Sequence, residues 1–398
     1  MTTDPGISSR AIVPVVAATP TLRFDRGELA GAFGDIGTDL PLLVGVILAT
    51  GLDPTTTFVV YGGLQILSGV VYRLPMPVQP LKAMAAIAIA GGVTAPTLAA
   101  GGLIVGVVML LLALSGTLGW IARIVPKPVV RGIQVGLGLQ LAQLAITRYV
   151  PADGPILGWG LGLVSLALVG VLIRNRKVPA ALIVIALGVV VAAITWPADL
   201  PSPLGLSLPR LPARLPTNEE FLRAASVLAL PQLALSLGNS VLATRQVVTD
   251  FFPEREPLTV RRIGTTYALM NLVSAPLGGL PVCHGSGGIA GHYAFGARTG
   301  GSIVMYGVFL IMAGLFLSND PLAFQRLFPS AVLGALLLVE AVTILSLVRD
   351  LANDRIAFTA ALLCGLVAVF VPYGYAVALV AGTLCYAIWQ RREAGAAQ

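Results

Sequence analysis

The sequence predicts an all-α polytopic membrane protein with about 14 transmembrane segments, arranged as a 7+7 inverted repeat with two half-helices. Three observations predict this fold: too little charge for a soluble surface, two interrupted apolar segments in corresponding places, and basic residues gathered on one side of the predicted membrane. Of the 398 residues, 56% are hydrophobic and 11% are charged, whereas soluble domains carry about 25% charged residues. The composition therefore argues against a soluble enzyme and a disordered chain.

The formal net charge of +7 does not indicate a nucleic-acid partner. Such binding needs basic side chains clustered on one face, and here the 25 basic residues are scattered between apolar runs. Cys283, Cys364 and Cys385 lack the CxxC spacing of a zinc site or a disulfide framework, so no metal and no cofactor are expected. The N-terminal residues lack the pattern of a cleavable signal peptide.

Charged residues, prolines and glycines divide the chain into apolar segments, and a spanning helix needs about 20 apolar residues. The predicted segments are 29–50, 55–72, 81–92, 97–121, 128–147, 156–173, 178–196, 222–244, 262–276, 284–297, 301–318, 325–348, 356–371 and 373–390. The predicted organisation is an N-terminal segment at 1–28, a first repeat at 29–196, a proline-rich outer linker at 197–221, a second repeat at 222–390 and a tail at 391–398.

The third segment of each block is too short to span a membrane and follows a stretch broken by proline and glycine. These two stretches are Arg73–Lys82 and Gly278–Gly288. Paired interruptions in corresponding places point to a transporter site built on discontinuous helices. Because each block holds an odd number of segments, the second enters the membrane in the opposite sense, which makes the repeat inverted.

The basic residues set the predicted orientation. With the N-terminus inside, 19 of the 25 basic residues lie on the cytoplasmic side, five lie outside, and Lys82 lies within the membrane. Cytoplasmic loops carry an excess of Lys and Arg. Both termini are therefore expected in the cytoplasm.

The two broken stretches together predict an anion site. A helix that begins inside the membrane leaves its first N–H groups unpaired and carries about half a positive charge there. Two such N-termini facing each other suit an anion. Donors dominate the stretches and carboxylates are absent, which favours a tetrahedral oxyanion. The candidate binding residues are Gln79, Lys82, Cys283, His284, Gly285, Ser286 and Gly287.

Other ionisable groups in the segments are functional candidates, because charge inside a membrane is costly. Asp35 and Asp39 are four residues apart, hence on one face of a helix, and one of them either pairs with Lys82 or carries a coupling proton. His292 is equally well a packed core histidine, and Glu340 is expected to be a structural partner. Polar residues of the eighth segment form one stripe, which either lines the binding site or makes packing contacts between helices. These residues are Gln232, Ser236, Asn239, Ser240 and Thr244.

Three motifs, Gly31–Pro41, Tyr72–Ala83 and Pro281–His292 continued by Phe295–Gly300, resemble the molybdate transporter family, which is related to the sulfate permeases (SulP). The resemblance implies a core domain of segments 1–4 and 8–11 and a gate domain of segments 5–7 and 12–14. It implies that the substrate lies between the starts of segments three and ten, flanked by segments one and eight, which adds Thr38 and Asn239 to the binding candidates.

The resemblance implies a plasma-membrane secondary transporter that imports molybdate by an elevator-like movement. Because a dianion enters against the membrane potential, a co-transported proton is expected, with Asp35, Asp39 or His284 as its carrier. The alternatives are a transporter of sulfate or another oxyanion and an anion channel on the same scaffold. An enzyme is not expected, since the chain has no HExxH, GxSxG or Walker-type motif. A homodimer rests on the resemblance alone.

Overall fold

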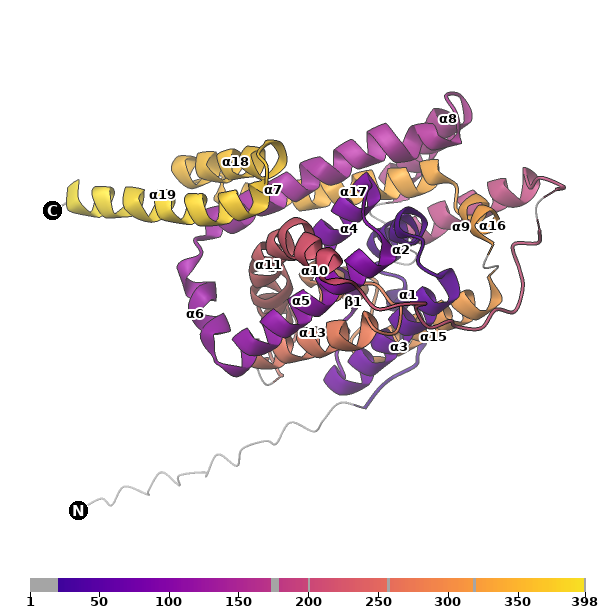
Figure 1. The fold of residues 1–398 in the computed structure, drawn as a ribbon, viewed down its shortest axis with the longest axis horizontal. Helices are drawn as coiled ribbons and strands as arrows, with labels where there is room; N and C mark the ends of the chain where they lie inside the picture. The colour runs from indigo at the N-terminus through magenta and orange to yellow at the C-terminus, as the bar shows by residue number, and fades with distance from the viewer. Residues whose placement is uncertain (1–20, 173–178, 200, 256–257, 318–319, 397–398) are drawn as a thin grey trace, which may run out of the picture.

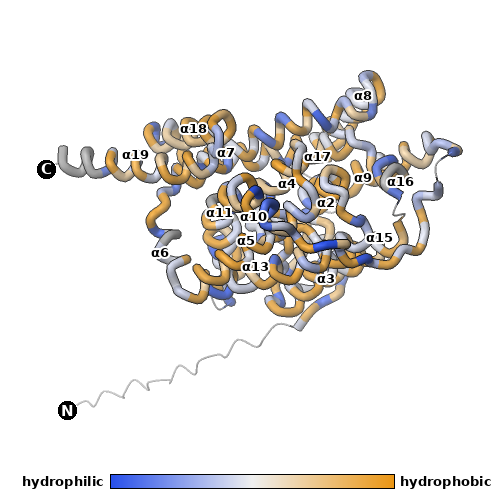
Figure 2. The backbone as a smooth tube through the Cα atoms, in the orientation of Figure 1, coloured by the Kyte–Doolittle hydropathy of each residue, from blue (hydrophilic) through white to orange (hydrophobic). Residues whose placement is uncertain are grey.

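The computed structural model describes residues 21–172, 179–199, 201–255, 258–317 and 320–396, and this part of the chain is helical with one two-stranded sheet (Figure 1). Apolar residues recur along most helices in Figure 2. Many of their side chains point outward: Leu163 is 62% exposed and Val171 is 80% exposed. An apolar outer surface of this kind is typical of a protein that faces lipid.

The helices pack into two groups. The first, here called the core group, contains α1 (Arg26–Ala32), α2 (Ile36–Thr50), α3 (Pro54–Tyr72), α4 (Lys82–Ala90), α5 (Ala95–Leu114), α6 (Thr117–Ile124), α10 (Asn218–Ala224), α11 (Leu230–Leu235), α12 (Thr244–Phe251), α13 (Val260–Ser274), α14 (Ser286–Ala294) and α15 (Gly301–Phe316). The strands β1 (Val78–Pro80) and β2 (Val282–His284) belong to it.

The second, the flanking group, lies along one side of the first, with α7, α17, α18 and α19 in the upper part of Figure 1. Its helices are α7 (Lys127–Leu144), α8 (Leu157–Leu172), α9 (Ala180–Ile194), α16 (Pro321–Leu327), α17 (Ser330–Ser346), α18 (Arg355–Phe370) and α19 (Gly374–Ala396). Helix α17 also packs against α2 and thereby joins the two groups.

By length and composition, three of the described helical stretches could cross a membrane on their own: Ala95–Leu114, Lys127–Asp153 and Ser330–Leu351. The bent pair α1 and α2 adds a fourth when counted as one span. Other apolar helices are shorter, and the number of spans stays a prediction.

The first predicted segment is not one helix. It bends by 41° between α1 and α2, where Phe33–Asp35 leave the helical path. Asp35 is therefore the N-cap residue of α2, and its carbonyl accepts from the Asp39 N–H at 3.1 Å, so the two aspartates still lie one helical turn apart. The prediction of one unbroken helix over 29–50 was wrong, whereas the spacing of the two aspartates on one turn is kept. Glycines at 31, 34 and 37 surround the break, and glycine disfavours a helix interior.

Several other boundaries differ from the prediction. The predicted segment 97–121 ends at Leu114, and the separate helix α6 follows. The predicted segment 325–348 is divided before Ser330, because Pro329 precedes the first turn of α17. The last helix continues beyond residue 390 to Ala396. The predicted junction near residues 173–178 and the N-terminal residues 1–20 lie outside the described residues.

The proline-rich linker lies against the core group. Leu204 pairs with Leu317, and the Arg210 N–H donates to Thr56 Oγ1 at 2.7 Å. The linker ends earlier than predicted, because Thr217 and Glu220 form a capping box that begins α10 at Asn218. Arg214 lowers the pKa of Glu220 to about 2, so this ion pair persists throughout the neutral pH range.

Candidate functional site

The two broken stretches meet inside the core group. Strands β1 and β2 pair in antiparallel register, with Gln79 opposite Cys283. The Leu81 N–H donates to the Pro281 carbonyl at 3.0 Å and extends the pairing by one bond. Half-helix α4 begins two residues after β1, and α14 begins two residues after β2. The structure therefore brings together the two short segments that the sequence singles out.

Each strand is held by an amide side chain from the helix that precedes it. Asn271 on α13 accepts from the Val282 N–H at 2.9 Å and donates to the Val282 carbonyl at 2.6 Å. Gln65 on α3 makes the same two bonds to Val78, at 2.9 Å and 2.8 Å. Both amides are fully buried. These clamps satisfy backbone groups that neither a helix nor the short sheet would pair.

Sequence reasoning missed these clamps, although a signal for them exists. Tyr61, Gln65 and Ser68 share the spacing of Tyr267, Asn271 and Ser274. The two serines make equivalent bonds: Ser68 Oγ donates to the Met76 carbonyl at 2.6 Å, and Ser274 Oγ to the Leu280 carbonyl at 2.7 Å. The matched polar triplet before each broken stretch is therefore the sequence signal for the side chains that hold the two strands in place.

The polar stripe of the eighth segment faces the site. Gln232 Oε1 accepts from the N–H groups of Ala83 and Met84, at 3.1 Å and 3.2 Å, and so caps the start of α4. Ser236 bonds to the hydroxyl of Tyr267 at 2.8 Å, and Thr244 Oγ1 donates to the His284 carbonyl at 3.4 Å. The side chain of Asn239 lies outside the described residues.

Gln79 lies at the centre of the strand pair and is 1% exposed. Its Nε2 donates to Asp35 Oδ2. Its Oε1 is buried without a hydrogen-bond partner among the described residues. The amide lies directly over Gly285: a Cβ there would meet Gln79 Oε1 at 1.3 Å. Only glycine therefore fits at position 285 beside this amide.

Lys82 begins α4 and forms an ion pair with Glu340 of α17. The structure therefore places Lys82 against Glu340 rather than against Asp35 or Asp39. Glu340 Oε2 also accepts from Thr38 Oγ1 at 2.9 Å. Glu340 is thus the ion-pair partner of Lys82. It belongs to the flanking group, whereas Lys82 and Thr38 belong to the core group.

The two histidines differ in their surroundings. His284 is fully buried, with Nδ1 3.2 Å from the Pro77 carbonyl and Nε2 3.0 Å from Thr266 Oγ1. Because a carbonyl only accepts, Nδ1 carries the proton, and the ring joins β2 to the first broken stretch. His292 is also buried, 6.1 Å from the ring of Tyr306 between centroids. Neither of its ring nitrogens has a hydrogen-bond partner among the described residues, so its role stays a prediction.

The remaining predicted residues surround the strand pair. Cys283 is 3% exposed and lies in β2 as a free thiol. Ser286 is the first residue of α14, and Gly287 follows it beside open space, since a Cβ added there would meet no heavy atom within 4 Å. Asp39 is fully buried, and neither of its carboxyl oxygens has a hydrogen-bond partner in the part of the chain that the structure describes.

A cavity of about 780 Å³ lies between the two groups, and Thr38 is the candidate binding residue that lines it. Gly34, Thr38 and Gly291 line it from the core group, and Ala180 and Glu340 line it from the flanking group. Glu340, the ion-pair partner of Lys82, therefore borders this cavity.

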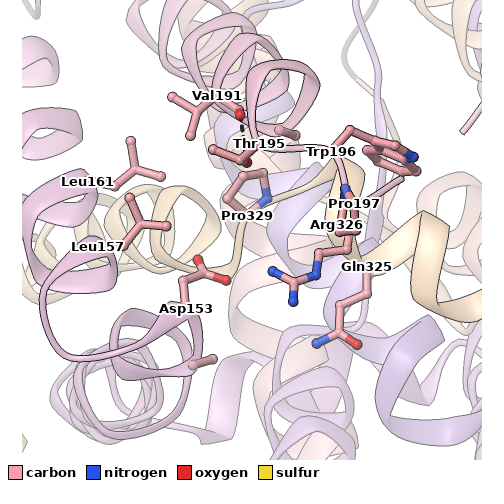
Figure 3. Close-up of a pocket in the computed structure, with 12 residues that line it drawn as sticks. Asp153, Leu157, Leu161, Val191, Thr195, Trp196, Pro197, Gln325, Arg326 and Pro329 are labelled. Atoms are coloured by element: carbon pink, nitrogen blue, oxygen red, sulfur yellow. Dashed lines mark hydrogen bonds between the residues drawn. The ribbon is translucent and has the colours of Figure 1, made fainter. Parts of the chain in front are cut away.

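A smaller cavity of about 250 Å³ lies elsewhere, within the flanking group (Figure 3). Asp153, Trp196 and Arg326 line it. Asp153 Oδ2 accepts from the Ala331 N–H at 2.7 Å, in the first turn of α17. This aspartate thus caps the helix that carries Glu340, which gives it a structural role.

Discontinuous helices that meet at a buried strand pair, with apolar side chains facing outward, define a multi-pass membrane protein of the transporter class. A family model described as "Molybdate transporter of MFS superfamily" matches residues 27–141 and 224–344. The chain belongs to the molybdate transporter family.

Curated relatives and solved structures agree with this assignment. The chain is 34% identical to "Molybdate transporter 1" of Arabidopsis thaliana, over 94% of this chain and 91% of that protein. It is 28% identical to "Molybdate transporter 1" of Chlamydomonas reinhardtii, over 84% and 86%.

The fold is similar to the transmembrane domain of the cyanobacterial bicarbonate transporter BicA, with a TM-score of 0.66 and 19% identity over 90% of this chain and 98% of that one. It is also similar to SLC26A9, with a TM-score of 0.70 and 14% identity over 92% and 65%.

Proposed function

We propose that this protein is a secondary active transporter that imports molybdate across the plasma membrane. The observation that carries the proposal is the meeting of two half-helix starts at one strand pair, with Gln79 and Lys82 beside them. Each helix start contributes partial positive charge and Lys82 contributes a full one. Membership of the molybdate transporter family supports molybdate as the oxyanion.

The proposed movement is elevator-like, with the core group carrying the anion past the flanking group. Support comes from the division of contacts: both strands, both half-helices and the clamps belong to the core group, whereas α17 supplies Glu340 from the other. Moving each negative charge inward against 100 mV costs about 2.3 kcal/mol. A co-transported proton offsets part of this cost.

Uptake of labelled molybdate into proteoliposomes tests the function. We expect accumulation that increases when the outside is made more acidic than the inside. Absence of uptake would contradict molybdate transport, and uptake that ignores the pH gradient would contradict proton coupling. Competition by excess sulfate separates molybdate from the alternative oxyanion substrate, and currents far above carrier turnover would indicate a channel.

Among the three candidate proton carriers, the contacts favour Asp35. His284 has both ring nitrogens engaged, and the carboxyl oxygens of Asp39 make no hydrogen bond to another described residue. Asp35, in contrast, holds Gln79 Nε2 while Gln79 Oε1 has no partner within the described ranges. A protonated Asp35 would donate to Oε1, so the amide would turn and release Nε2 to the anion.

We expect Asp35→Asn to remove the dependence of molybdate accumulation on the pH gradient. For one proton per cycle, a gradient of one pH unit is worth a factor of about ten, and this factor should be lost. Asp250→Asn is the matched control, because Asp250 is exposed and bonds only to Gln246 among the residues that the structure describes. Loss of the dependence in Asp39→Asn but not in Asp35→Asn would assign the proton to Asp39 instead.

A further inference from the structure

The positive charge at the predicted anion site is already occupied by a carboxylate. Glu340 Oε1 pairs with Lys82 Nζ, and its Oε2 accepts from Thr38 Oγ1 at 2.9 Å. The side chains of Lys82 and Glu340 are only 7% and 12% exposed. Glu340 is thus an oxyanion held by an ammonium group and a hydroxyl group, which are donors of the kind that an oxyanion substrate would use.

This carboxylate comes from the opposite group of helices. Glu340 lies on α17, which packs against α7 and α8 of the flanking group, whereas Lys82 and Thr38 lie on α4 and α2 of the core group. The pair therefore does two things at once. It neutralises Lys82, and it links the core group, which carries the site, to the flanking group.

A dianion is electrostatically disfavoured beside Lys82 while Glu340 remains paired with that lysine. It would place two more negative charges beside the carboxylate of Glu340, with Asp35 also nearby in the electrostatic surroundings of Lys82. Like charges that share one cation repel each other strongly where water is largely excluded. The cavity of about 780 Å³ has Glu340 and Thr38 in its wall, so an arriving anion meets the pair from the open side.

We propose that Glu340 is a built-in competitor of the substrate: it occupies Lys82 when the site is empty, and the oxyanion displaces it. This inference rests on the proposed function. Displacement of Glu340 removes the ion pair between the two groups of helices, so the loaded core group is held less firmly against α17. The empty core group is held by the same contact until a new anion arrives.

Replacing the competitor by a neutral group tests this directly. Glu340→Gln keeps the size of the side chain and an oxygen that can accept from Thr38, but leaves Lys82 without its carboxylate. We expect molybdate to bind the purified Glu340→Gln protein about tenfold more tightly than the wild type, measured by calorimetry in detergent. Glu219→Gln makes the same chemical change on exposed α10 and should leave the affinity unchanged.

The possible outcomes separate this inference from the proposed function. If the wild type binds none of molybdate, tungstate and sulfate, the proposed function fails. If the wild type binds molybdate while a folded Glu340→Gln protein binds it equally or more weakly, Glu340 is not a competitor. Lower thermal stability together with tighter binding supports the proposal, because loss of a purely structural contact would not increase affinity. A Lys82→Gln/Glu340→Gln double variant should lose the gain.

Discussion

Replacing Gly285 by alanine is expected to weaken molybdate binding by at least tenfold. The new Cβ would lie 1.3 Å from Gln79 Oε1 and 2.3 Å from Gln79 Cδ, so the amide must leave its place between the strands. Overpacking of this kind lowers stability by about 1–3 kcal/mol. A hydrogen bond from the displaced amide to an anion is worth about 1.5–3 kcal/mol, and about 1.4 kcal/mol corresponds to a factor of ten in affinity. Loss of the Gln79 contact to Asp35 adds to the effect.

Binding calorimetry and thermal unfolding of the same preparations check this result. Gly63→Ala is the matched control, because Gly63 lies on the outer side of α3 and no heavy atom lies within 4 Å of its added Cβ. A Gly285→Ala protein that binds molybdate like the wild type would show that Gln79 does not contribute to the site from its observed position.

The second large effect is expected when the amide side chains that hold the two strands, those of Asn271 and Gln65, are replaced. Asn271→Leu leaves the N–H and the carbonyl of Val282 without their side-chain partner. Each unsatisfied buried group costs about 1–3 kcal/mol, so the free energy of unfolding should fall by about 2–6 kcal/mol. Gln65→Leu should be milder, because the Val78 carbonyl keeps a bond from the Tyr61 hydroxyl at 2.6 Å.

The order of these two variants is the measurable quantity. Thermal unfolding in detergent should rank the wild type above Gln65→Leu and Gln65→Leu above Asn271→Leu. Gln246→Leu makes a comparable change on exposed α12 and should unfold close to the wild type. The reverse order would mean that the Tyr61 bond does not compensate for Gln65, and an Asn271→Leu protein as stable as the wild type would mean that the clamps do not stabilise the strand pair.

Much of the site follows from the sequence because its signals are local. Proline fixes its own backbone and restrains the residue before it, so Pro75, Pro77 and Pro80 predict an extended stretch. The glycines around His284 act differently: they disfavour a helix interior and leave the backbone amides open to close approach. The resemblance to a known family then supplies the arrangement of the segments. These signals are enough to bring Gln79, Lys82 and Gly285 to one place.

What the sequence could not predict is which distant groups contact one another. Lys82 and Glu340 are 258 positions apart, and hydrophobic patterning carries no information about such pairs. The bend at Asp35 has a local signal in its glycines, yet it also depends on close packing: a Cβ at Gly34 would lie 2.5 Å from the backbone of Gly291. The scaffolding role of His284 likewise depends on partners from other elements.

The bonds between β1 and β2 also bear on the energetics of transport. Because β1 and β2 are joined to each other, the starts of α4 and α14 that follow them, here called the cradle, are held at a fixed spacing. In the proposed elevator-like movement this spacing would stay the same throughout. An anion held there would keep the same core-group donors on the way in as at the start, while its neighbours from the flanking group change. The cradle then sets how tightly the ion is held, while the direction of net flow is left to the ion gradients on either side.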